Sequence, residues 1–385
     1  MTKVRNDQNW IFDNFLKLSD NEDTLHPGVL AQRLERGYKY HDLQRVYSRV
    51  SGRRSYSKSW AQEGKRLQSL AERSLSNETR AQFYHRASMC WGRAQHTIKG
   101  STNPQKVHYY QQMEMCWELF CKCSKLNITN GKTKNSRFVF IDSPNAIATV
   151  LICPGMDQFA QEVVFPYNNP WLERGFNVLI VEGPGHASQR MLDNHLSVTG
   201  MTDAVHEVME IYKQLPFVIF GMSFGSRWAI EAAADKQDEI ACVCGQMANV
   251  GSTQNIFNFA QPNFARIFME MTGITNEEEF ESYSQSIDSY HHEQASKLTV
   301  PYLLVTGEQD ELCSPEQVEQ FIKEHIPHGE VWIYEDCFHV MGEVCGDIYA
   351  QIADWAKLCV LGDSGHIKSG INWIAQDGFS KGQQF

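Results

Sequence analysis

The chain has 385 residues, 42% of them hydrophobic and 21% charged, so it can bury a large core and is not expected to be disordered. Its formal net charge of −11 argues against nucleic acid or an anionic membrane surface as the main partner. No apolar stretch reaches the roughly 18 residues that a membrane-spanning helix needs, and the N-terminus lacks the apolar segment of a secretory signal.

Residues 1–130 are predicted to form an all-helical domain. Small and aromatic residues recur there at spacings of three and four, which places them on one face of each helix. The three stripes are Trp60, Gly64, Leu67, Ala71 and Leu75; Ala81, Tyr84, Ala87, Trp91 and Ala94; and Tyr110, Met113, Trp117 and Phe120. Further helices are expected at Phe12–Leu18 and Val29–Tyr38, and a polar turn at 127–131 ends the domain.

After residue 131, short apolar runs alternate with helical segments. The candidate strands are 138–141, 148–153, 177–181, 217–221, 241–244, 302–306 and 331–334, with helices at 204–215, 226–234, 316–324 and 347–358. Such a pattern indicates an α/β core over 131–385 with a mostly parallel sheet covered on both faces. A Phe- and Met-rich insertion at 248–298 either covers the core or lines a pocket, and the tail at 362–385 shows no clear pattern.

The segment Gly221-Met-Ser-Phe-Gly225 directly follows a predicted strand and opens a predicted helix. A serine on such a tight turn points its hydroxyl away from the sheet, and the flanking glycines avoid collisions with neighbouring backbone. Chance gives a Gly-x-Ser-x-Gly pattern in about one chain of this length in ten, on average composition. The flanking strand and helix make chance a poor explanation, so Ser223 is the candidate nucleophile.

A serine nucleophile needs a base, and the base needs a carboxylate to orient it. When the serine stands on such a turn, the acid and then the histidine follow it along the chain. Asp310 lies in the turn after the strand at 302–306, and His339 follows the strand at 331–334. Both residues therefore belong to the sheet edge that carries Ser223. The competing acids are Glu308, Glu311 and Asp336, of which Asp336 is the strongest.

An oxyanion hole should use the backbone N–H of Phe224, which follows the nucleophile, and a second N–H from the loop after an earlier strand. The turn after the strand at 148–153 assigns that second N–H to Met156, with Asp157 as the neighbouring alternative and a candidate substrate contact. His186, in the next loop, could donate a proton to substrate, although a position at the surface is favoured for it.

The sequence predicts neither a metal nor a cofactor. No His/Asp/Glu cluster has metal-ligand spacing, and the closest cysteine pairs, Cys121/Cys123 and Cys242/Cys244, are not of the CxxC type. Neither a dinucleotide fingerprint nor a P-loop follows the glycine turn at 183–185. Eleven cysteines without an export signal are expected to be reduced thiols, which favours a cytoplasmic location.

The serine turn, together with the helical segments Trp60–Gly64, Ala81–Ser88 and Ala94-Gln95, resembles one branch of the α/β-hydrolases. That branch includes 2,6-dihydroxypseudooxynicotine hydrolase, fermentation-respiration switch esterase-like proteins and hydrolases that shorten polyketides in pigment and anthraquinone pathways. The resemblance covers about residues 10–360. It implies an N-terminal helical cap over the active site and matches the family's nucleophile, acid and base to Ser223, Asp310 and His339.

One departure separates the chain from the pseudooxynicotine enzyme. A relative is thought to use an extra carboxylate in the segment that corresponds to 245–254, and that segment contains no acid here. The comparison with polyketide-shortening members is therefore favoured. It implies hydrolytic C–C cleavage of a β-dicarbonyl in a hydrophobic, aromatic or polyketide substrate that is either free or bound to a carrier.

The triad residues alone do not select the bond that is cleaved, so a carboxylesterase or thioesterase acting on a hydrophobic substrate is the alternative. A non-catalytic binding protein built on the helical domain is a third interpretation, which an intact set of triad residues disfavours. A homodimer is one oligomeric state that the chain could adopt.

Overall fold

The computed structural model describes Asn14 and residues 28–247, 249–254, 256–259, 262–363, 365–375 and 380–383. The helix expected at Phe12–Leu18 lies outside these residues except for Asn14. Ala248, where the expected insertion begins, and parts of the expected tail also lie outside them.

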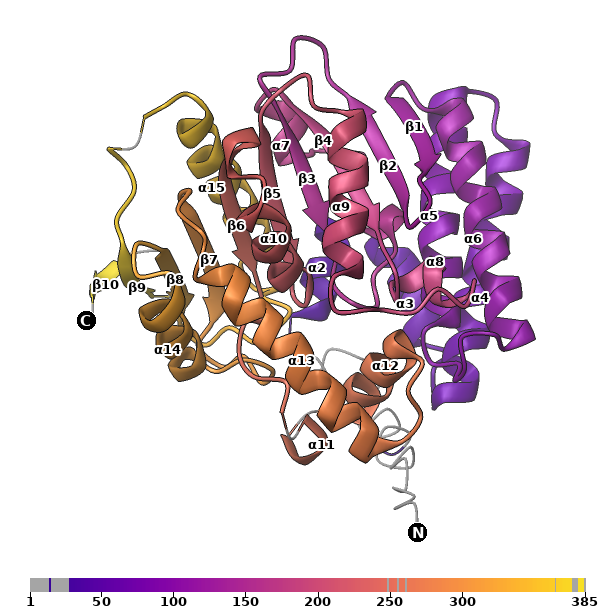
Figure 1. The fold of residues 1–385 in the computed structure, drawn as a ribbon. Coiled ribbons are helices and arrows are strands. Elements are labelled where there is room, and N and C mark those ends of the chain that lie inside the picture. The colour runs from indigo at the N-terminus through magenta and orange to yellow at the C-terminus, as the bar shows by residue number, and fades with distance from the viewer. Residues whose placement is uncertain are drawn as a thin grey trace.

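Five helices form the N-terminal region within the described residues. Their bounds are α2 (Val29–Glu35), α3 (Tyr40–Tyr47), α4 (Arg53–Arg73), α5 (Asn77–Gln95) and α6 (Pro104–Cys123). The side chain of Ser76 caps α5 by accepting a hydrogen bond from the N–H of Thr79. Asn103 caps α6, and Pro104 at its first position suits a site where no N–H is needed. Figure 1 shows α4, α5 and α6 side by side at one end of the sheet.

The apolar stripes predicted for these helices face inward. Trp60, Ala87 and Met113 pack in one buried cluster that the helices share. Leu75 is the exception, because its side chain is fully exposed beyond the end of α4. The backbone becomes extended at Ser74, with ψ of 145°, so Leu75 leaves the helical face on which its spacing would have placed it.

The strands in the described part of the chain form one mixed sheet of ten. Their bounds are β1 (Asn127–Lys132), β2 (Arg137–Asp142), β3 (Ala148–Cys153), β4 (Phe176–Glu182), β5 (Phe217–Met222), β6 (Ile240–Gln246), β7 (Tyr302–Gly307), β8 (Glu330–Tyr334), β9 (Gly370–Ile374) and β10 (Ser380–Gln383). The order is β1-β2-β4-β3-β5-β6-β7-β8-β9-β10. Strands β3 to β9 pair in parallel, whereas β1, β2 and β10 run antiparallel to their neighbours.

Every strand predicted from the sequence is present, and each differs by no more than two residues at either end. The polar turn expected at 127–131 is wrong, because Asn127–Lys132 forms strand β1 and pairs with β2. This strand lies at the sheet edge and none of its residues is buried, so it needs no apolar pattern. The tail contributes β9, which pairs with β8 and extends the sheet at the other side.

Helices cover both faces of the sheet (Figure 1). Their bounds are α7 (Pro170–Glu173), α8 (Ala187–Arg190), α9 (Gly200–Ile211), α10 (Gly225–Ala234), α14 (Pro315–His325) and α15 (Cys345–Val360), with a 3₁₀ turn, η1, at Ala160–Glu162. Residues of α9, α10 and α14 pack with Leu151 and Ile219, whereas α7 and α15 pack with Val150 and Val218. Neighbouring strand residues point to opposite faces and both are buried, which explains the continuous apolar runs.

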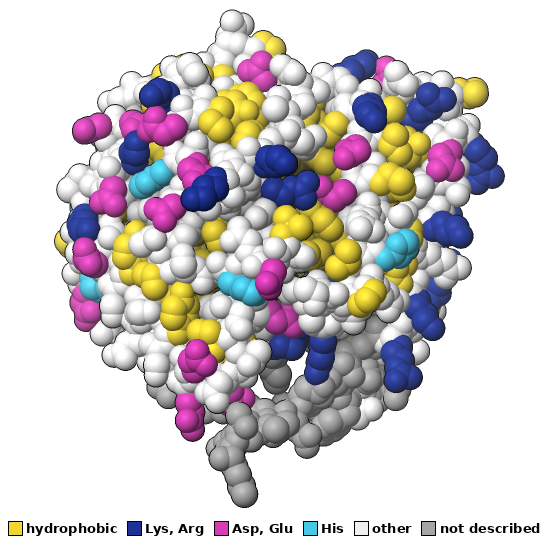
Figure 2. Space-filling view, turned by 45° about the vertical axis from the view of Figure 1, so that its right-hand side comes forward, with side chains coloured by type: hydrophobic (Ala, Val, Ile, Leu, Met, Phe, Trp, Pro, Cys, Tyr) yellow, Lys and Arg dark blue, Asp and Glu magenta, His cyan; other side chains and the backbone are white. Residues whose placement is uncertain are grey.

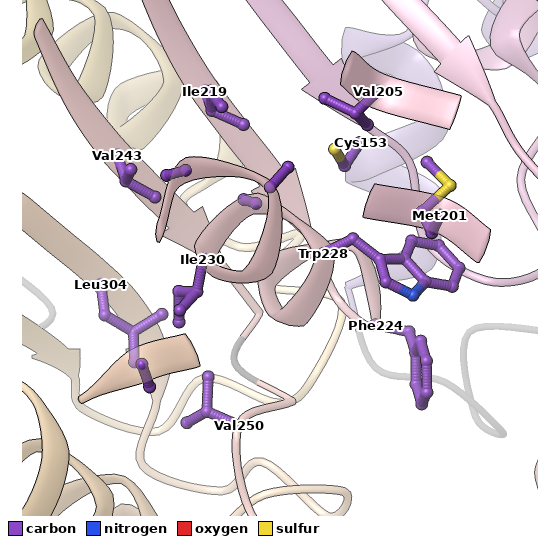
Figure 3. Packing of buried hydrophobic residues seen from close by; sticks show 14 of the residues in the cluster. Cys153, Met201, Val205, Ile219, Phe224, Trp228, Ile230, Val243, Val250 and Leu304 are labelled. Carbon is purple, nitrogen blue, oxygen red and sulfur yellow. The ribbon is translucent and has the colours of Figure 1, made fainter. Parts of the chain in front are cut away.

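The insertion between β6 and β7 forms helices α11 (Ile256–Phe259), α12 (Pro262–Thr272) and α13 (Glu277–Ala295) in its described residues. The Phe and Met side chains of this insertion were expected either to cover the core or to line a pocket. Phe268 and Met271 cover the core, because both are fully buried in it. The ring of Phe268 meets that of Phe224 at 4.8 Å between centroids. Figure 3 shows the side chains of Phe224 and Trp228 next to each other at the start of α10, and both belong to the buried cluster that contains Phe268 and Met271.

A buried ion pair fastens the insertion to α10. Arg227 is fully buried and donates from Nη2 to Asp288 of α13 at 2.7 Å, and from Nη1 to the carbonyl of Gly251 at 3.0 Å. The carboxylate of Asp288 also accepts from the N–H and the hydroxyl of Thr253 at 2.8 and 2.9 Å. These added hydrogen bonds stabilise the buried pair, although Nε of Arg227 has no partner among the described residues.

We expect Arg227→Met to lower the free energy of unfolding by about 3–5 kcal/mol, because it leaves Asp288 buried without its counter-charge. Urea unfolding followed by circular dichroism measures the change. The double variant Arg227→Met/Asp288→Asn should lose less than the single variant, since the remaining group is neutral. Equal losses in the two variants would show that packing, and not the lost ion pair, sets the cost.

Candidate active site

The turn from β5 to α10 holds Ser223 in a strained backbone conformation. Its φ is +53°, a left-handed value that non-glycine residues seldom adopt. A Cβ at Gly221 would lie 2.3 Å from the carbonyl oxygen of Gly225, and one at Gly225 would lie 2.0 Å from that of Cys153. Both glycines are therefore required, and Ser223 remains half-buried while the residues around it are buried.

Three predicted residues meet at the carboxyl edge of the sheet. The Oγ atom of Ser223 lies 2.7 Å from Nε2 of His339. Nδ1 of His339 lies 3.0 and 2.9 Å from the two carboxylate oxygens of Asp310. In this tautomer Nδ1–H donates to Asp310, which leaves Nε2 free to accept the hydroxyl proton of Ser223.

Hydrogen bonds and burial fix the carboxylate of Asp310 where it can orient the imidazole. Its Oδ1 accepts hydrogen bonds from the N–H groups of Leu312 at 2.9 Å and Cys313 at 3.1 Å, and its side chain is buried. Burial alone would lower the pKa of His339, but the charge and hydrogen bond of Asp310 raise it above its ordinary value. His339 is therefore a stronger base than a buried histidine without such a partner.

The competing acids occupy other positions. Glu311 accepts a hydrogen bond from the backbone N–H of His339 at 3.2 Å and so contacts the loop, not the ring nitrogen. Glu308 accepts from the N–H of Asp336 at 3.0 Å. Asp336, the strongest alternative from sequence, has φ of +56° in the turn after β8.

The loop that carries His339 rests on the start of α2. A Cβ at Gly342 would lie 1.6 Å from the carbonyl oxygen of Gly28, so the two backbones touch at a point where only glycine fits. Nε2 of Gln32 donates to the carbonyl of Val340 at 2.9 Å. The first described helix of the N-terminal region is thus part of the support of the base.

The loop after β3 lies beside Ser223, as the oxyanion-hole prediction requires. A Cβ at Gly155 would lie 3.3 Å from that of Ser223, and the N–H of Gly155 donates to Gln158 at 2.8 Å. Met156 follows directly, with its side chain buried in the core cluster. The N–H groups of Met156 and Phe224 remain the predicted oxyanion donors.

The surface position favoured for His186 is wrong, because His186 is fully buried. Its Nε2 lies 2.7 Å from the carbonyl oxygen of Gly155, and its ring packs against Trp228 at 5.1 Å. Burial lowers the pKa of His186 to about 4, so the ring is neutral at pH 7 and its Nε2–H donates to Gly155. The contact identifies His186 as a positioning residue for the loop beside Ser223.

We expect His186→Ala to lower kcat by about tenfold with little change in KM, since it leaves the Gly155 carbonyl without its donor and loosens the loop. His186→Gln should restore most of kcat because its amide can reach the same carbonyl. Steady-state kinetics on one substrate with all three proteins measures the effect. Unchanged kcat in His186→Ala would remove the positioning role.

Asp157 lies in a cluster of basic side chains that the sequence did not reveal. Its carboxylate is 3.5 Å from Nδ1 of His96, and about a third of its side chain is exposed (34%). The other basic groups that act on it are Arg93 of α5, Arg190 of α8 and Arg36 at the end of α2. Desolvation would raise the pKa of Asp157, but these positive charges lower it. Because they come from separate elements, no local spacing marks them.

No helix among the described residues combines the length and apolar character needed to cross a membrane. No group of three or more His, Cys, Asp or Glu side chains within them is arranged to hold a metal ion. All eleven cysteines are free thiols, most of them buried. On the face in Figure 2, small hydrophobic groups are separated by charged side chains of both signs.

Comparison with a protein-family model identifies the chain's relatives. Residues 164–362, just over half of the chain, match the model of the prolyl oligopeptidase family. The chain belongs to this family. The matched residues include Ser223, Asp310 and His339, whereas helices α2–α6 precede them. No curated protein matches this member of the prolyl oligopeptidase family.

Solved structures extend the likeness over the helical region. The 2,6-dihydroxy-pseudo-oxynicotine hydrolase matches with a TM-score of 0.71 at 15% identity, over 88% of this chain and 97% of that one. Wild-type AbyA5 matches with a TM-score of 0.65 at 11% identity, over 94% and 100%. These values confirm the predicted fold class, an α/β-hydrolase fold with an N-terminal helical region. This prolyl oligopeptidase-family member is a hydrolase of the α/β-hydrolase type.

Proposed function

We propose that the chain is a serine hydrolase in which Ser223 is the nucleophile, His339 the general base and Asp310 the residue that orients it. One observation carries the proposal: a continuous chain of hydrogen-bond distances from Ser223 Oγ through His339 to Asp310. The left-handed φ of Ser223 adds to it, because that strain presents the hydroxyl at the sheet edge.

For a β-dicarbonyl substrate the steps balance with one water. Nε2 of His339 takes the proton as Ser223 Oγ attacks one ketone, and the N–H groups of Phe224 and Met156 bind the oxyanion. Collapse breaks the C–C bond and expels an enolate, whose carbon takes the proton from His339. Water, deprotonated by His339, then attacks the acyl-enzyme, and His339 returns this proton to Ser223 Oγ as the acid leaves. The products are a shortened ketone and a carboxylic acid.

The preference for a C–C bond rests on the resemblance to polyketide-shortening hydrolases, because the triad would cleave an ester or thioester equally well. We place the substrate between the helical region and the insertion. These two parts meet where Glu270 of α12 accepts a hydrogen bond from the N–H of Gly100 at 3.3 Å. Binding sites at such junctions are usually enclosed and mostly apolar. We propose that the helical region acts as a cap that selects the substrate.

We expect purified protein in H₂¹⁸O to cleave an aryl β-diketone and to place the label in the released acid and not in the ketone, because water attacks only the acyl-enzyme. Mass spectrometry of both products measures the label. The matched ester and thioester, and a short peptide with an internal proline, are assayed in parallel because the family's name describes peptidases. Rapid hydrolysis of the ester with the diketone untouched would favour the carboxylesterase alternative.

A further inference from the structure

Two buried arginines near the candidate active site lack partners for part of their guanidinium groups. Arg36 is 8% exposed and Arg190 is 5% exposed. Among the described residues, Nε and Nη2 of Arg36 and Nη1 of Arg190 have no hydrogen-bond partner. Guanidinium N–H groups keep their charge and cannot accept, so burial without an acceptor is costly. Such donors indicate a ligand with negatively charged oxygens.

The acids nearest these arginines already have other donors. Glu162 accepts from the N–H of Phe159 at 3.2 Å, and Glu182 accepts from the N–H of Ala160 at 2.5 Å. Glu270, the acid that acts most strongly on Arg190, pairs through Oε1 with Arg266 at 2.5 Å, and its buried Oε2 has no hydrogen-bond partner among the described residues. The carboxylate of Asp157 lies 3.5 Å from Nδ1 of His96 and also interacts electrostatically with Arg93. None of these acidic side chains therefore accepts a hydrogen bond from Nε or Nη2 of Arg36 or from Nη1 of Arg190.

Both arginines interact with residues that are neighbours of the reacting groups. Both act on Asp157, which follows Gly155 by two residues, and Gly155 adjoins Ser223. The side chains of Arg36 and Gln246 both interact with the hydroxyl of Tyr349. The backbone carbonyl of Gln246 accepts a hydrogen bond from the N–H of Ser223 at 2.8 Å. About a third of the Asp157 side chain is exposed (34%), so a ligand can reach the group of charged side chains around Asp157 from solvent.

We propose that Arg36 and Arg190 bind a carboxylate of the substrate, at the junction of the helical region and the core, beside the bond that Ser223 attacks. This inference rests on the proposed function in assigning the carboxylate to the molecule that is cleaved. A planar carboxylate suits the fork of a guanidinium group. A phosphate dianion fits less well, because Asp157 and Glu162 would repel its second charge more strongly.

The test measures binding without turnover, in protein that carries Ser223→Ala. The probes are a phenyl β-diketone whose other end carries a propionate, and its primary amide. We expect calorimetry to show the carboxylate bound about tenfold or more tightly than the amide, a difference of about 1.4 kcal/mol. Arg36→Gln and Arg190→Gln should each reduce that preference severalfold while amide binding stays within about twofold.

Arg174→Gln is the matched control, because Arg174 pairs with Asp354 at the opposite edge of the sheet and should leave the preference intact. Equal binding of carboxylate and amide would overturn the proposal, as would a preference that survives both arginine variants. The comparison of the two probes needs no arginine variant, so it tests the proposal even if one of those variants fails to fold.

A second pair of probes, phenyl esters with the same propionate or amide end, separates this site from the bond that is cleaved. A carboxylate preference among the esters, with diketones untouched by wild-type protein, would retire the C–C proposal and keep the binding site. Cleavage of diketones without any carboxylate preference would keep the C–C proposal and remove the binding site.

Discussion

Ser223→Ala should abolish turnover while leaving the fold intact. The substitution removes the only atom that the proposal places in covalent contact with the substrate, and losses in characterised serine hydrolases are on the order of 10⁴–10⁶ in kcat. Alanine also keeps a Cβ at the strained position, so thermal unfolding should change little. The rate of product formation from the best substrate, measured at enzyme concentrations high enough to detect the residual rate, gives the loss.

Ser289→Ala is the matched control, because Ser289 is an exposed serine on α13. It should retain wild-type activity. A Ser223→Ala protein that kept more than a tenth of wild-type kcat would contradict the nucleophile assignment. Acylation of Ser223 by a fluorophosphonate, followed by peptide mass spectrometry, provides a readout that does not depend on knowing the substrate.

Asp310→Asn should lower kcat by about 10⁴, because an amide in that position favours the wrong tautomer of His339 and cannot stabilise the imidazolium. The pH profile should change as well. In the wild type, activity falls as pH drops through the pKa of His339, which Asp310 raises above its ordinary value. Without that charge, burial dominates and the pKa falls, so the acid limb of kcat/KM should move to lower pH.

Asp336→Asn is the decisive comparison, since Asp336 is the strongest alternative acid in the sequence. It should keep kcat within a few-fold and leave the acid limb in place. A larger loss in Asp336→Asn than in Asp310→Asn would reverse the assignment of the acid.

The residues of the candidate site were predictable because each follows an apolar strand. Ser223, Asp310 and His339 all lie just past the carboxyl end of a buried parallel strand, and continuous apolar runs mark such strands in sequence. Chain order then placed them on one sheet edge. The distances between these three side chains depend on the backbone turns that carry them. The glycine pattern predicted the turn at Ser223 only.

Features without a local signature were missed. Strand β1 is polar because it is an edge strand with no buried residue, so pairing with β2, not burial, determines it. His186 is buried although it stands in a loop, because its ring packs on Trp228 of the core and the adjacent Ala187 packs with the helical region. Arg36 and Arg190 belong to elements far apart in sequence, and only the folded chain brings both near Asp157. Such contacts follow from tertiary packing, which residue spacing does not encode.

The contact between Gly28 and Gly342 limits how this architecture can be rebuilt. Because α2 touches the loop that carries His339, the helical region is not a module that can be exchanged without affecting the base. A chimera with a foreign helical segment joined near residue 125 would bring another side chain or another backbone path to Gly342, and the imidazole would shift with its loop. Substrate range in this architecture is therefore more readily altered by substitutions within α4, α5 and α6 than by swapping the whole segment, since those helices can change while α2 continues to hold the base.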